Sequence, residues 1–264
     1  MITSKSNSLV KLIRSLKDKS NRDELSLFVA EGAKNTKEAI LSNFGINCIV
    51  GTIDGFNVLS KKAPEFCKVD GENVDICRDG SKIKAEIVSD EVFSGLTGEK
   101  SPQGILSLIE KPETKPLEPH GKCIFLDELQ DPSNVGAIIR TAAAAGYDEI
   151  YLAHSADPFN EKAVRASMGG ILKVKLYIGE RQELLNFIDC PLVVADMDGE
   201  DAFTCQIDGD FCLVIGNEGN GVSSVVEERA KRKVSIPMEN GMESLNAAVS
   251  AGILMYALRG QCKK

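Results

Sequence analysis

The stretch that decides the fold is CIFLDELQDPSNVGAIIRTAAAAGYDEIYLA, residues 123–153. Two apolar runs, 123–127 and 149–153, flank a longer segment, 135–145, that is rich in alanine and isoleucine. Short apolar runs are typical of strands buried on both faces, and the longer segment between them is typical of a helix. The stretch therefore predicts a strand, a crossover helix and a second strand parallel to the first.

The same alternation continues toward the end of the chain. Further strands are expected at 173–178, 192–196, 212–216 and 234–237, and further helices at 161–167, 181–188, 222–231 and 245–258. The acidic segment 196–210 is expected to be a solvated loop. This alternation predicts an α/β fold with a mostly parallel sheet covered on both faces. Ligands of such sheets bind at the carboxyl ends of strands, so the loops after residues 127, 216 and 237 are the places to search.

A smaller α/β domain is expected before this one. The segment 110–122, EKPETKPLEPHGK, contains three prolines and no apolar period, which is typical of an extended linker. The boundaries are predicted as 1–110 for the smaller domain, 111–122 for the linker and 123–264 for the larger domain. In the first domain we expect an opening amphipathic helix, a helix at 36–42 and strands at 27–30, 48–51 and 105–109. The opening helix is indicated by the spacing of Leu9, Leu12, Ile13 and Leu16.

The composition limits the class of protein. Hydrophobic residues make up 43% of the chain and charged residues 27%, which is typical of a globular protein and excludes disorder as the overall class. The longest apolar candidate, 245–258, is too short for a membrane helix, and the N-terminal segment lacks the apolar core of a secretory signal. The eight cysteines form no C-x-x-C pair and only two histidines accompany them, so we expect free thiols, no metal site and a reducing cytoplasm.

The charge is unevenly distributed. The net charge is −8, yet residues 1–22 contain six basic residues and one acidic residue. Because phosphate binding depends on Lys and Arg, this segment could face RNA, although a solvated helix face would have the same composition. The basic residues are Lys5, Lys11, Arg14, Lys17, Lys19 and Arg22.

The loop after residue 127 contains the first group of candidate site residues. Asn134 stands where a helix N-cap is expected, and capping alone would explain it. Gly136 lowers helix propensity and suggests close approach of a ligand or of backbone. Arg140 interrupts an apolar helix, so we expect it to be buried and either to find an anionic partner or to line a site. It lies about 240° around the helix from Asn134, so the two do not share a face.

The other two loops are rich in small and polar residues. Gly216, Gly219 and Gly221 surround Glu218 after a buried strand, and glycines there expose backbone N–H groups to a ligand, although a tight strand-to-helix turn would look the same. In the third loop, Ser244 is the expected N-cap of the last helix. Asn246 lies two residues further on and cannot share a helix face with Ser244, so at least one of them belongs to the entry loop.

Together the three loops resemble the three signature motifs of the SpoU (TrmH-like) family of RNA ribose 2′-O-methyltransferases, of the SPOUT class. The matching residues are Asn134-x-Gly136-x-x-x-Arg140, then Gly216-x-Glu218-x-x-Gly221 with Ile236-Pro237, and finally Ser244-Leu245-Asn246. The segment RASMGG (165–170) is similar to a family segment near the active site. SPQGILSLIEKP (101–112) is similar to the last strand of an L30e-like substrate-binding domain.

The resemblance implies a parallel sheet threaded into a trefoil knot, S-adenosylmethionine as cofactor, RNA as substrate and a homodimer. It implies that Gly216, Gly221, Ile236 and Leu245 hold the cofactor, and that Asn134, Arg140, Glu218, Ser244 and Asn246 form the catalytic site. RNA would bind Lys11, Arg14, Lys17 and Arg165. No metal or membrane is implied.

Chemical reasoning adds a hypothesis about roles. A guanidinium is a poor base, so we expect Arg140 to bind the RNA phosphate and stabilise the developing alkoxide, with Glu218 and Asn134 orienting it. Ribosomal RNA is favoured because the L30e-like extension resembles that of members acting on rRNA. The alternatives are a tRNA ribose methyltransferase and a non-catalytic RNA-binding or ribosome-assembly factor. A nucleotide-using metabolic enzyme is disfavoured because no phosphate-loop motif is present.

Overall fold

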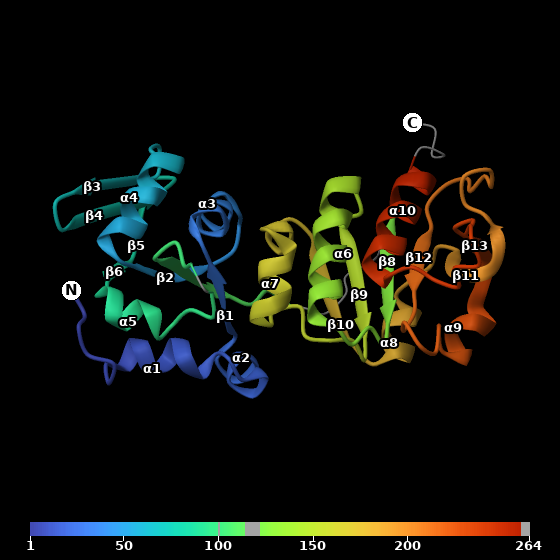
Figure 1. Ribbon diagram of the computed structural model, residues 1–264, viewed down its shortest axis with the longest axis horizontal. Helices are drawn as coiled ribbons and strands as arrows, with labels where there is room; N and C mark the ends of the chain where they lie inside the picture. The colour runs from blue at the N-terminus through green and yellow to red at the C-terminus, as the bar shows by residue number, and fades with distance from the viewer. Residues whose placement is uncertain (100, 114–121, 260–264) are drawn as a thin grey trace. The chain divides into compact units, whose positions relative to one another are not determined.

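The computed structural model describes residues 1–99, 101–113 and 122–259 (Figure 1). It divides into two compact units. Unit 1 contains Met1–Pro112 together with Phe159–Leu172, and unit 2 contains Glu113–Pro158 and Lys173–Lys264. The sequence had assigned 159–172 to the larger domain. Most of the predicted linker, 114–121, lies outside the described residues.

Unit 1 is built on a four-stranded sheet of order β1-β7-β2-β6, in which only the β2/β6 pair is parallel. Its strands are β1 (Leu27–Glu31), β2 (Ile46–Gly51), β6 (Ala85–Ile87) and β7 (Ile105–Glu110). A separate antiparallel sheet contains β3 (Cys67–Asp70), β4 (Asn73–Arg78) and β5 (Ser81–Ile83). The helices are α1 (Ser8–Ser15), α2 (Lys19–Leu25), α3 (Ala33–Leu41), α4 (Ile53–Lys62), α5 (Asp90–Ser94) and α7 (Glu161–Ser167), followed by a 3₁₀ turn at Gly170–Leu172.

The opening helix forms as its spacing predicts. The Asn7 side chain accepts from the backbone N–H of Leu9 at 2.9 Å and caps α1, while Val10 and Ile13 bury one face of the helix against the unit 1 core. Sequence reasoning did not identify α2, α4, α5, β6 or the β3–β5 sheet. All but α4 are short, and α4 contains Gly55, which lowers helix propensity.

Unit 2 contains a six-stranded sheet of order β10-β9-β8-β12-β11-β13 in which all neighbouring strands are parallel. The strands are β8 (Cys123–Asp127), β9 (Glu149–Ala153), β10 (Lys175–Gly179), β11 (Leu192–Asp201), β12 (Cys212–Ile215) and β13 (Ala230–Ser235). The helices are α6 (Pro132–Ala145), α8 (Arg181–Asn186), α9 (Ser224–Arg229) and α10 (Ala247–Arg259). The predicted α/β class with a parallel sheet is confirmed. Its threading through a knot stays a prediction.

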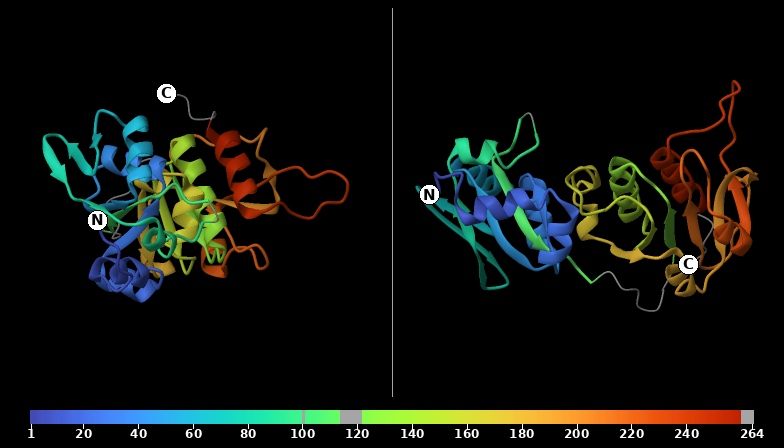
Figure 2. Two further views of the ribbon diagram at one scale, coloured as in Figure 1. Left: turned by 60° about the vertical axis from the view of Figure 1, so that its left-hand side comes forward. Right: turned by 90° about the horizontal axis from the view of Figure 1, so that it is seen from below.

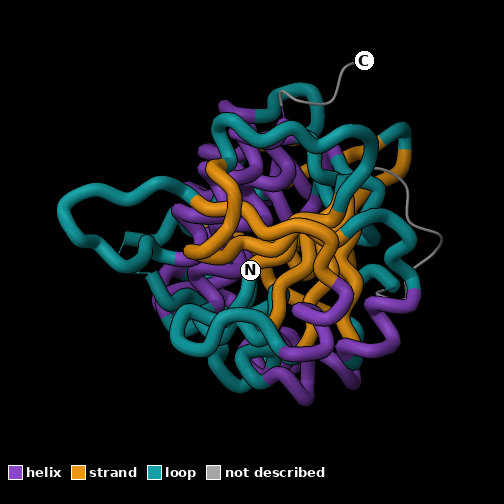
Figure 3. Tube along the Cα trace, turned by 90° about the vertical axis from the view of Figure 1, so that its right-hand side faces the viewer, coloured by secondary structure: helices purple, strands orange, loops and turns teal. Residues whose placement is uncertain are grey.

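Helices cover both faces of this sheet, as the helices on either side of the strands show in Figure 3. On one face, Phe125 of β8 and Tyr151 of β9 pack with Leu184 of α8 and Val226 of α9. The side chains of neighbouring residues in each strand, such as Ile124, point to the opposite face, where α6 packs against α10. The segment that joins β13 to α10 extends away from the sheet (Figure 2).

Several predicted boundaries in unit 2 are wrong. The helix expected at 135–145 begins at Pro132, and Asp131 is its N-cap, because the Asp131 carboxylate accepts from the backbone N–H of Ser133 at 2.8 Å. Asn134 therefore lies inside the first turn. The acidic segment 196–210 is not all loop, since β11 continues through a bulge to Asp201 and pairs with β13.

None of the described helices combines the length and the apolar character that a bilayer span requires. The seven cysteines within the described residues form no disulfide, and Cys262 lies outside those residues. No group of three or more His, Cys, Asp or Glu side chains in the described part of the chain is arranged to hold a metal ion.

Gly55 tests the packing of unit 1. A Cβ atom at this position in α4 would overlap the carbonyl oxygen of Gly104. We expect Gly55→Ala to lower the free energy of unfolding by about 1–3 kcal/mol because backbone atoms must move, although alanine favours helix. Lys61→Ala at an exposed position of the same helix is the control and should change stability little. Chemical denaturation measures both, and equal stability of the two variants would contradict the packing argument.

Candidate active site

Three polar side chains from distant parts of the chain meet beyond the carboxyl ends of the unit 2 strands. The Asn134 amide nitrogen donates to a Glu218 carboxylate oxygen at 2.7 Å, and the Asn246 amide nitrogen donates to the Asn134 carbonyl oxygen at 3.0 Å. Asn134 is only 8% exposed, so both of its polar atoms are used inside the protein. The structure thus joins one residue from each of the three sequence motifs in a single hydrogen-bonded chain.

The sheet order explains why these residues meet. β8 and β12 are neighbours, with Leu126 opposite Ile215, so the loops that follow them start side by side. The chain leaves β8 toward α6 and β9 on one side of the sheet, while β11 and β13 lie on the other side. Such a reversal of strand order opens a crevice at the carboxyl ends of the strands, which is where α/β sheets bind ligands.

Asn246, and not Ser244, caps the last helix. Its side-chain oxygen accepts from the backbone N–H groups of Ala248 at 3.0 Å and Val249 at 3.3 Å. The predicted cap at Ser244 is therefore wrong, and both Ser244 and Asn246 precede α10. Because the helix N-terminus fixes the Asn246 oxygen, its amide nitrogen points to Asn134.

The loop that carries Glu218 is a tight turn. Asn217 and Gly221 exchange two backbone hydrogen bonds, at 2.9 and 3.0 Å, and the Asn217 side-chain oxygen accepts from the backbone N–H groups of Gly219 and Asn220. A Cβ atom at Gly216 would overlap the backbone of Gly221, and Gly221 has a φ of +68°. Glycine is therefore required at both positions by the turn itself.

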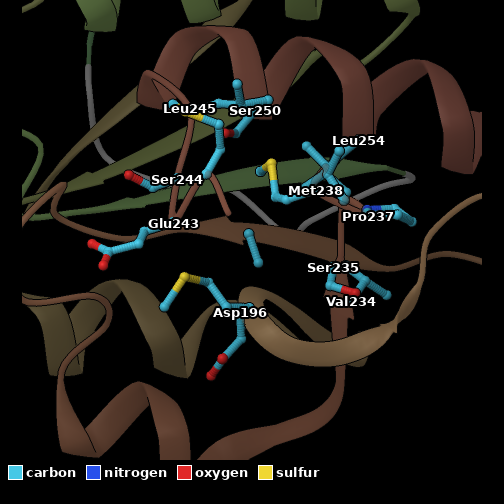
Figure 4. Close-up of a pocket in the computed structure, with 14 residues that line it drawn as sticks. Asp196, Val234, Ser235, Pro237, Met238, Glu243, Ser244, Leu245, Ser250 and Leu254 are labelled. Carbon is cyan, nitrogen blue, oxygen red and sulfur yellow. The ribbon is translucent and has the colours of Figure 1, made fainter. Parts of the chain in front are cut away.

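A cavity of about 520 Å³ opens between β11, the end of β13, the segment after β13 and α10 (Figure 4). Leu245, Ser244 and Ser250 line one side of it, and Asp196 lies on the opposite side. Its remaining walls are mainly apolar and come from the middle of β11, the end of β13, the segment after β13, and α10. They consist of Ala195, Met197, Val234, Ser235, Ile236, Pro237, Met238, Met242, Glu243 and Leu254. Volume and lining are typical of a small-molecule site.

A second cavity, of about 440 Å³, shares residues 195–197 and 243–245 with the first. Gly216, Glu218 and Gly221 line it as well. The predicted cofactor residues thus border the two adjoining cavities. Ile236 lines the first cavity, Gly216 and Gly221 line the second, and Leu245 lines both. Of the catalytic candidates, Glu218 lines the second cavity and Ser244 lines both.

Sequence reasoning missed the middle of β11, where the bulge interrupts its pairing with β13. Ala195, Asp196 and Met197 border both cavities. Lys233 donates to the Asp196 carboxylate at 2.8 Å, and this hydrogen bond holds the pKa of Asp196 below its usual value. The rule that ligands bind at strand ends does not reach this segment, because the strand continues past residue 196 to Asp201.

Arg140 is not buried as the sequence suggested. Its side chain is exposed on α6, and among the described residues its guanidinium forms no ion pair or hydrogen bond. Glu218 and Asn134 pair with each other and do not orient Arg140 within this chain. The guanidinium is therefore available to an external anion such as an RNA phosphate.

The four predicted RNA-binding residues differ in availability. Lys11 and Lys17 are exposed, whereas Arg14 is half-buried and donates to the carbonyl oxygen of Gly95 at 3.3 Å. Arg165 lies among the carboxylates of Glu31, Glu99 and Glu161, at 3.6, 3.0 and 2.6 Å, so its charge is compensated within unit 1. We therefore retain only Lys11 and Lys17 as free cations of the predicted set.

The charged side chains of Arg22 and Glu31 form hydrogen bonds inside unit 1. Arg22, which contributes to the basic segment, is 3% exposed and donates to the carbonyl oxygens of Leu16 and Lys17, so it stabilises the α1–α2 turn. Burial raises the pKa of Glu31, although Thr97 donates a hydrogen bond to it. Because Arg22 is buried, residues 1–22 present less positive charge at the surface than their sequence indicates.

Comparison with known proteins identifies the family. Residues 121–256 match the SpoU rRNA Methylase family, and residues 7–107 match the MRM3-like substrate binding domain. The first match contains all three motifs and both cavities. The second lies within unit 1.

Similar proteins and structures agree with these matches. The chain is 34% identical to the 23S rRNA (guanosine(2553)-2′-O)-methyltransferase RlmP of Bacillus subtilis, over 67% of this chain and 73% of that protein. It is 28% identical to an uncharacterized tRNA/rRNA methyltransferase of Synechocystis, over 98% and 93% of the two chains. The crystal structure of an AdoMet-bound rRNA methyltransferase from Sinorhizobium meliloti superposes with a TM-score of 0.82 at 28% identity, covering 98% of this chain and 97% of that one. On these grounds the chain belongs to the SpoU rRNA methylase family.

Proposed function

We propose that this protein transfers a methyl group from S-adenosylmethionine to a ribose 2′-hydroxyl of RNA, with ribosomal RNA as the substrate. The observation that carries the proposal is the hydrogen-bonded chain from Asn246 through Asn134 to Glu218 beside two adjoining cavities. A fixed polar cluster next to a small-molecule cavity is the arrangement that a transfer between a bound cofactor and a hydroxyl requires.

The cavities have the character that S-adenosylmethionine needs. The apolar walls of the larger cavity, including Ile236, Leu245 and Leu254, suit an adenine ring, while Asp196 and Glu243 suit the positively charged part of the cofactor. Gly216 and Gly221, which the turn requires as glycines, line the second cavity. When bound, S-adenosylmethionine supplies a sulfonium methyl group that an oxygen nucleophile attacks in line. The AdoMet-bound relative from Sinorhizobium meliloti supports this assignment.

The polar residues would orient the reacting hydroxyl. Asn134 is held by two neighbours, so it keeps the exposed Glu218 carboxylate in one position with little reorganisation. Glu218 and Ser244 face solvent beside the second cavity, where RNA can approach. Arg140 would bind an RNA phosphate and stabilise negative charge that develops on the ribose oxygen.

Two findings favour ribosomal RNA over transfer RNA. The relative RlmP is named for 23S rRNA, and residues 121–256 match a family described as rRNA methylases. Unit 1 would bind RNA through the exposed Lys11 and Lys17, while residues 120–264, with a net charge of −7, attract phosphate less.

We also propose a cytoplasmic homodimer. Val249 and Tyr256 are both 50% exposed on α10, and the half-buried Ile253 lies between them at helical spacing. A second copy that covers this apolar stripe would remove it from water. Arg140 lies exposed on α6, which packs against α10.

Arg140→Ala tests the proposed reaction. We expect kcat to fall by on the order of 10²-fold or more, because a charge that stabilises the transition state is removed, while the dissociation constant for S-adenosylmethionine stays within about twofold. Methyl transfer to rRNA and calorimetric titration measure the two quantities. Lys231→Ala removes another exposed cation of unit 2 and should retain activity. Near-normal kcat in Arg140→Ala would refute the assigned role.

The double variant Lys11→Glu/Lys17→Glu tests RNA docking. We expect RNA affinity to fall by on the order of tenfold, and the slope of log affinity against log salt to flatten by about 1.4–1.8, since two phosphate contacts are lost. Lys82→Glu, which changes an exposed lysine paired with Asp75, should have a much smaller effect. Equal RNA affinity of the double variant and the unmodified protein would show that RNA does not bind at Lys11 and Lys17.

Val249→Glu/Tyr256→Glu tests the dimer. Charges on the stripe should repel a second copy, so light scattering after size-exclusion chromatography should change from the mass of two chains to that of one. Phe187→Glu, at a residue that is 43% exposed after α8, should leave the mass unchanged. A monomer before substitution, or a dimer after it, would show that this stripe is not the interface.

A further inference from the structure

The loop that carries Glu218 is tied to two consecutive residues at the end of β8. The backbone N–H of Ser223 donates to one oxygen of the Asp127 carboxylate at 2.8 Å. At the other end of the loop, the Asn217 side chain donates to the backbone carbonyl oxygen of Glu128 at 3.0 Å. The loop is thus held at its start and at its finish, while Glu218 itself stays exposed between the two ties.

Both of these residues are held in turn by Arg181, the first residue of α8. The Arg181 Nε atom donates to the second Asp127 oxygen at 2.7 Å, and another guanidinium nitrogen donates to the Glu128 carboxylate. The Asp127 side chain is 1% exposed and that of Arg181 17%, whereas Glu128 is 44% exposed. One guanidinium therefore neutralises a buried carboxylate and binds its neighbour at the same time.

The backbone at this point needs such a restraint. Glu128 has a φ of +61°, which residues other than glycine rarely adopt. Its backbone N–H donates to the carbonyl oxygen of Ala153, so the strained residue is tied to β9 as well. Burial alone would lower the pKa of Arg181, but its hydrogen bonds to Asp127 and Glu128 raise that pKa above the usual value, so the guanidinium keeps its charge.

We propose that Arg181 is a positioning residue, which holds the Glu218 loop in its working conformation through Asp127 and Glu128. It lies outside all three sequence motifs, and the hydrogen bonds described for its guanidinium go to Asp127 and Glu128, which in turn hold the loop. The proposal rests on the role of the loop in the proposed methyl transfer. Its physical basis is that a planar guanidinium can bind two carboxylates at fixed angles, which an ammonium group cannot do.

Arg181→Met is the first test, because methionine keeps the length and removes the charge. It leaves the Asp127 carboxylate buried without its cation, which should weaken the tie to Ser223. We expect amide hydrogen exchange of residues 217–223 to accelerate by about tenfold or more, with protection elsewhere in unit 2 retained. Affinity for S-adenosylmethionine should fall by about tenfold and kcat by on the order of 10²-fold, because the loop lines the second cavity and carries Glu218.

Arg181→Lys keeps the charge and decides the question if Arg181→Met does not fold. A lysine should neutralise Asp127 but release Glu128, so we expect intermediate exchange in residues 217–223 and at least a threefold loss of cofactor affinity. Arg229→Met is the matched control, since Arg229 of α9 donates to the Asn186 side chain at 3.1 Å and not to Asp127. It should change neither exchange in the loop nor affinity.

The readouts separate this proposal from the proposed function. Exchange and cofactor binding do not depend on methyl transfer, so an unmodified protein that fails to methylate RNA would overturn the function and leave the Arg181 result to stand. Wild-type exchange and affinity in Arg181→Met, or in a folded Arg181→Lys, would overturn the positioning role. Exchange that rises uniformly through unit 2 would also overturn it, because that is the result of a purely structural role.

Discussion

The site depends on one buried amide. Asn134 has a single donor group facing Glu218 and a single acceptor facing Asn246, and at 8% exposure it has little water with which to replace either partner. An unpaired amide atom in such a place costs about 1–3 kcal/mol, so the three loops are stable in this arrangement only together. Asn134 thereby joins two segments that lie 84 and 112 residues further along the chain into one polar surface.

The sheet makes this meeting possible, and the N-terminus of α10 fixes the third loop. Because all neighbouring strands of unit 2 are parallel, their carboxyl ends gather at one edge, and the adjacency of β8 and β12 places two of the loops together. The Asn246 side chain uses the N-terminus of α10 as its anchor, so the third loop is fixed by a helix and not by a strand. Rigid elements thus supply the precision, and the loops supply the chemistry.

The sequence predicted what depends on local pattern. The strand, helix and strand within 123–153 follow from buried apolar runs, and all three are present. The meeting of the three motifs was predicted from the resemblance, since spacing along the chain does not reveal which strands become neighbours. Asn134 as an N-cap was wrong because Asp131, three residues earlier, offers an equally good cap and Pro132 suits the first helical position.

Other errors concern properties that only packing determines. Arg140 was expected to be buried because its neighbours in sequence are apolar, yet it faces outward from α6. The acidic residues in the second half of β11 concealed a bulged strand whose Asp196 borders both cavities, since acidic composition alone indicates solvent. Arg181 gave no sequence signal, because its partners lie more than fifty residues away.

The central claim is that these loops direct a methyl group to a ribose hydroxyl of RNA. The most direct measurement is incubation of ribosomal RNA with the protein and S-adenosylmethionine labelled in its methyl group, followed by alkaline hydrolysis. The account predicts label in an alkali-resistant dinucleotide, because a methylated 2′-oxygen can no longer attack the adjacent phosphate. Label released in mononucleotides, which would indicate methylation of a base, or no incorporation into RNA at all, would contradict it.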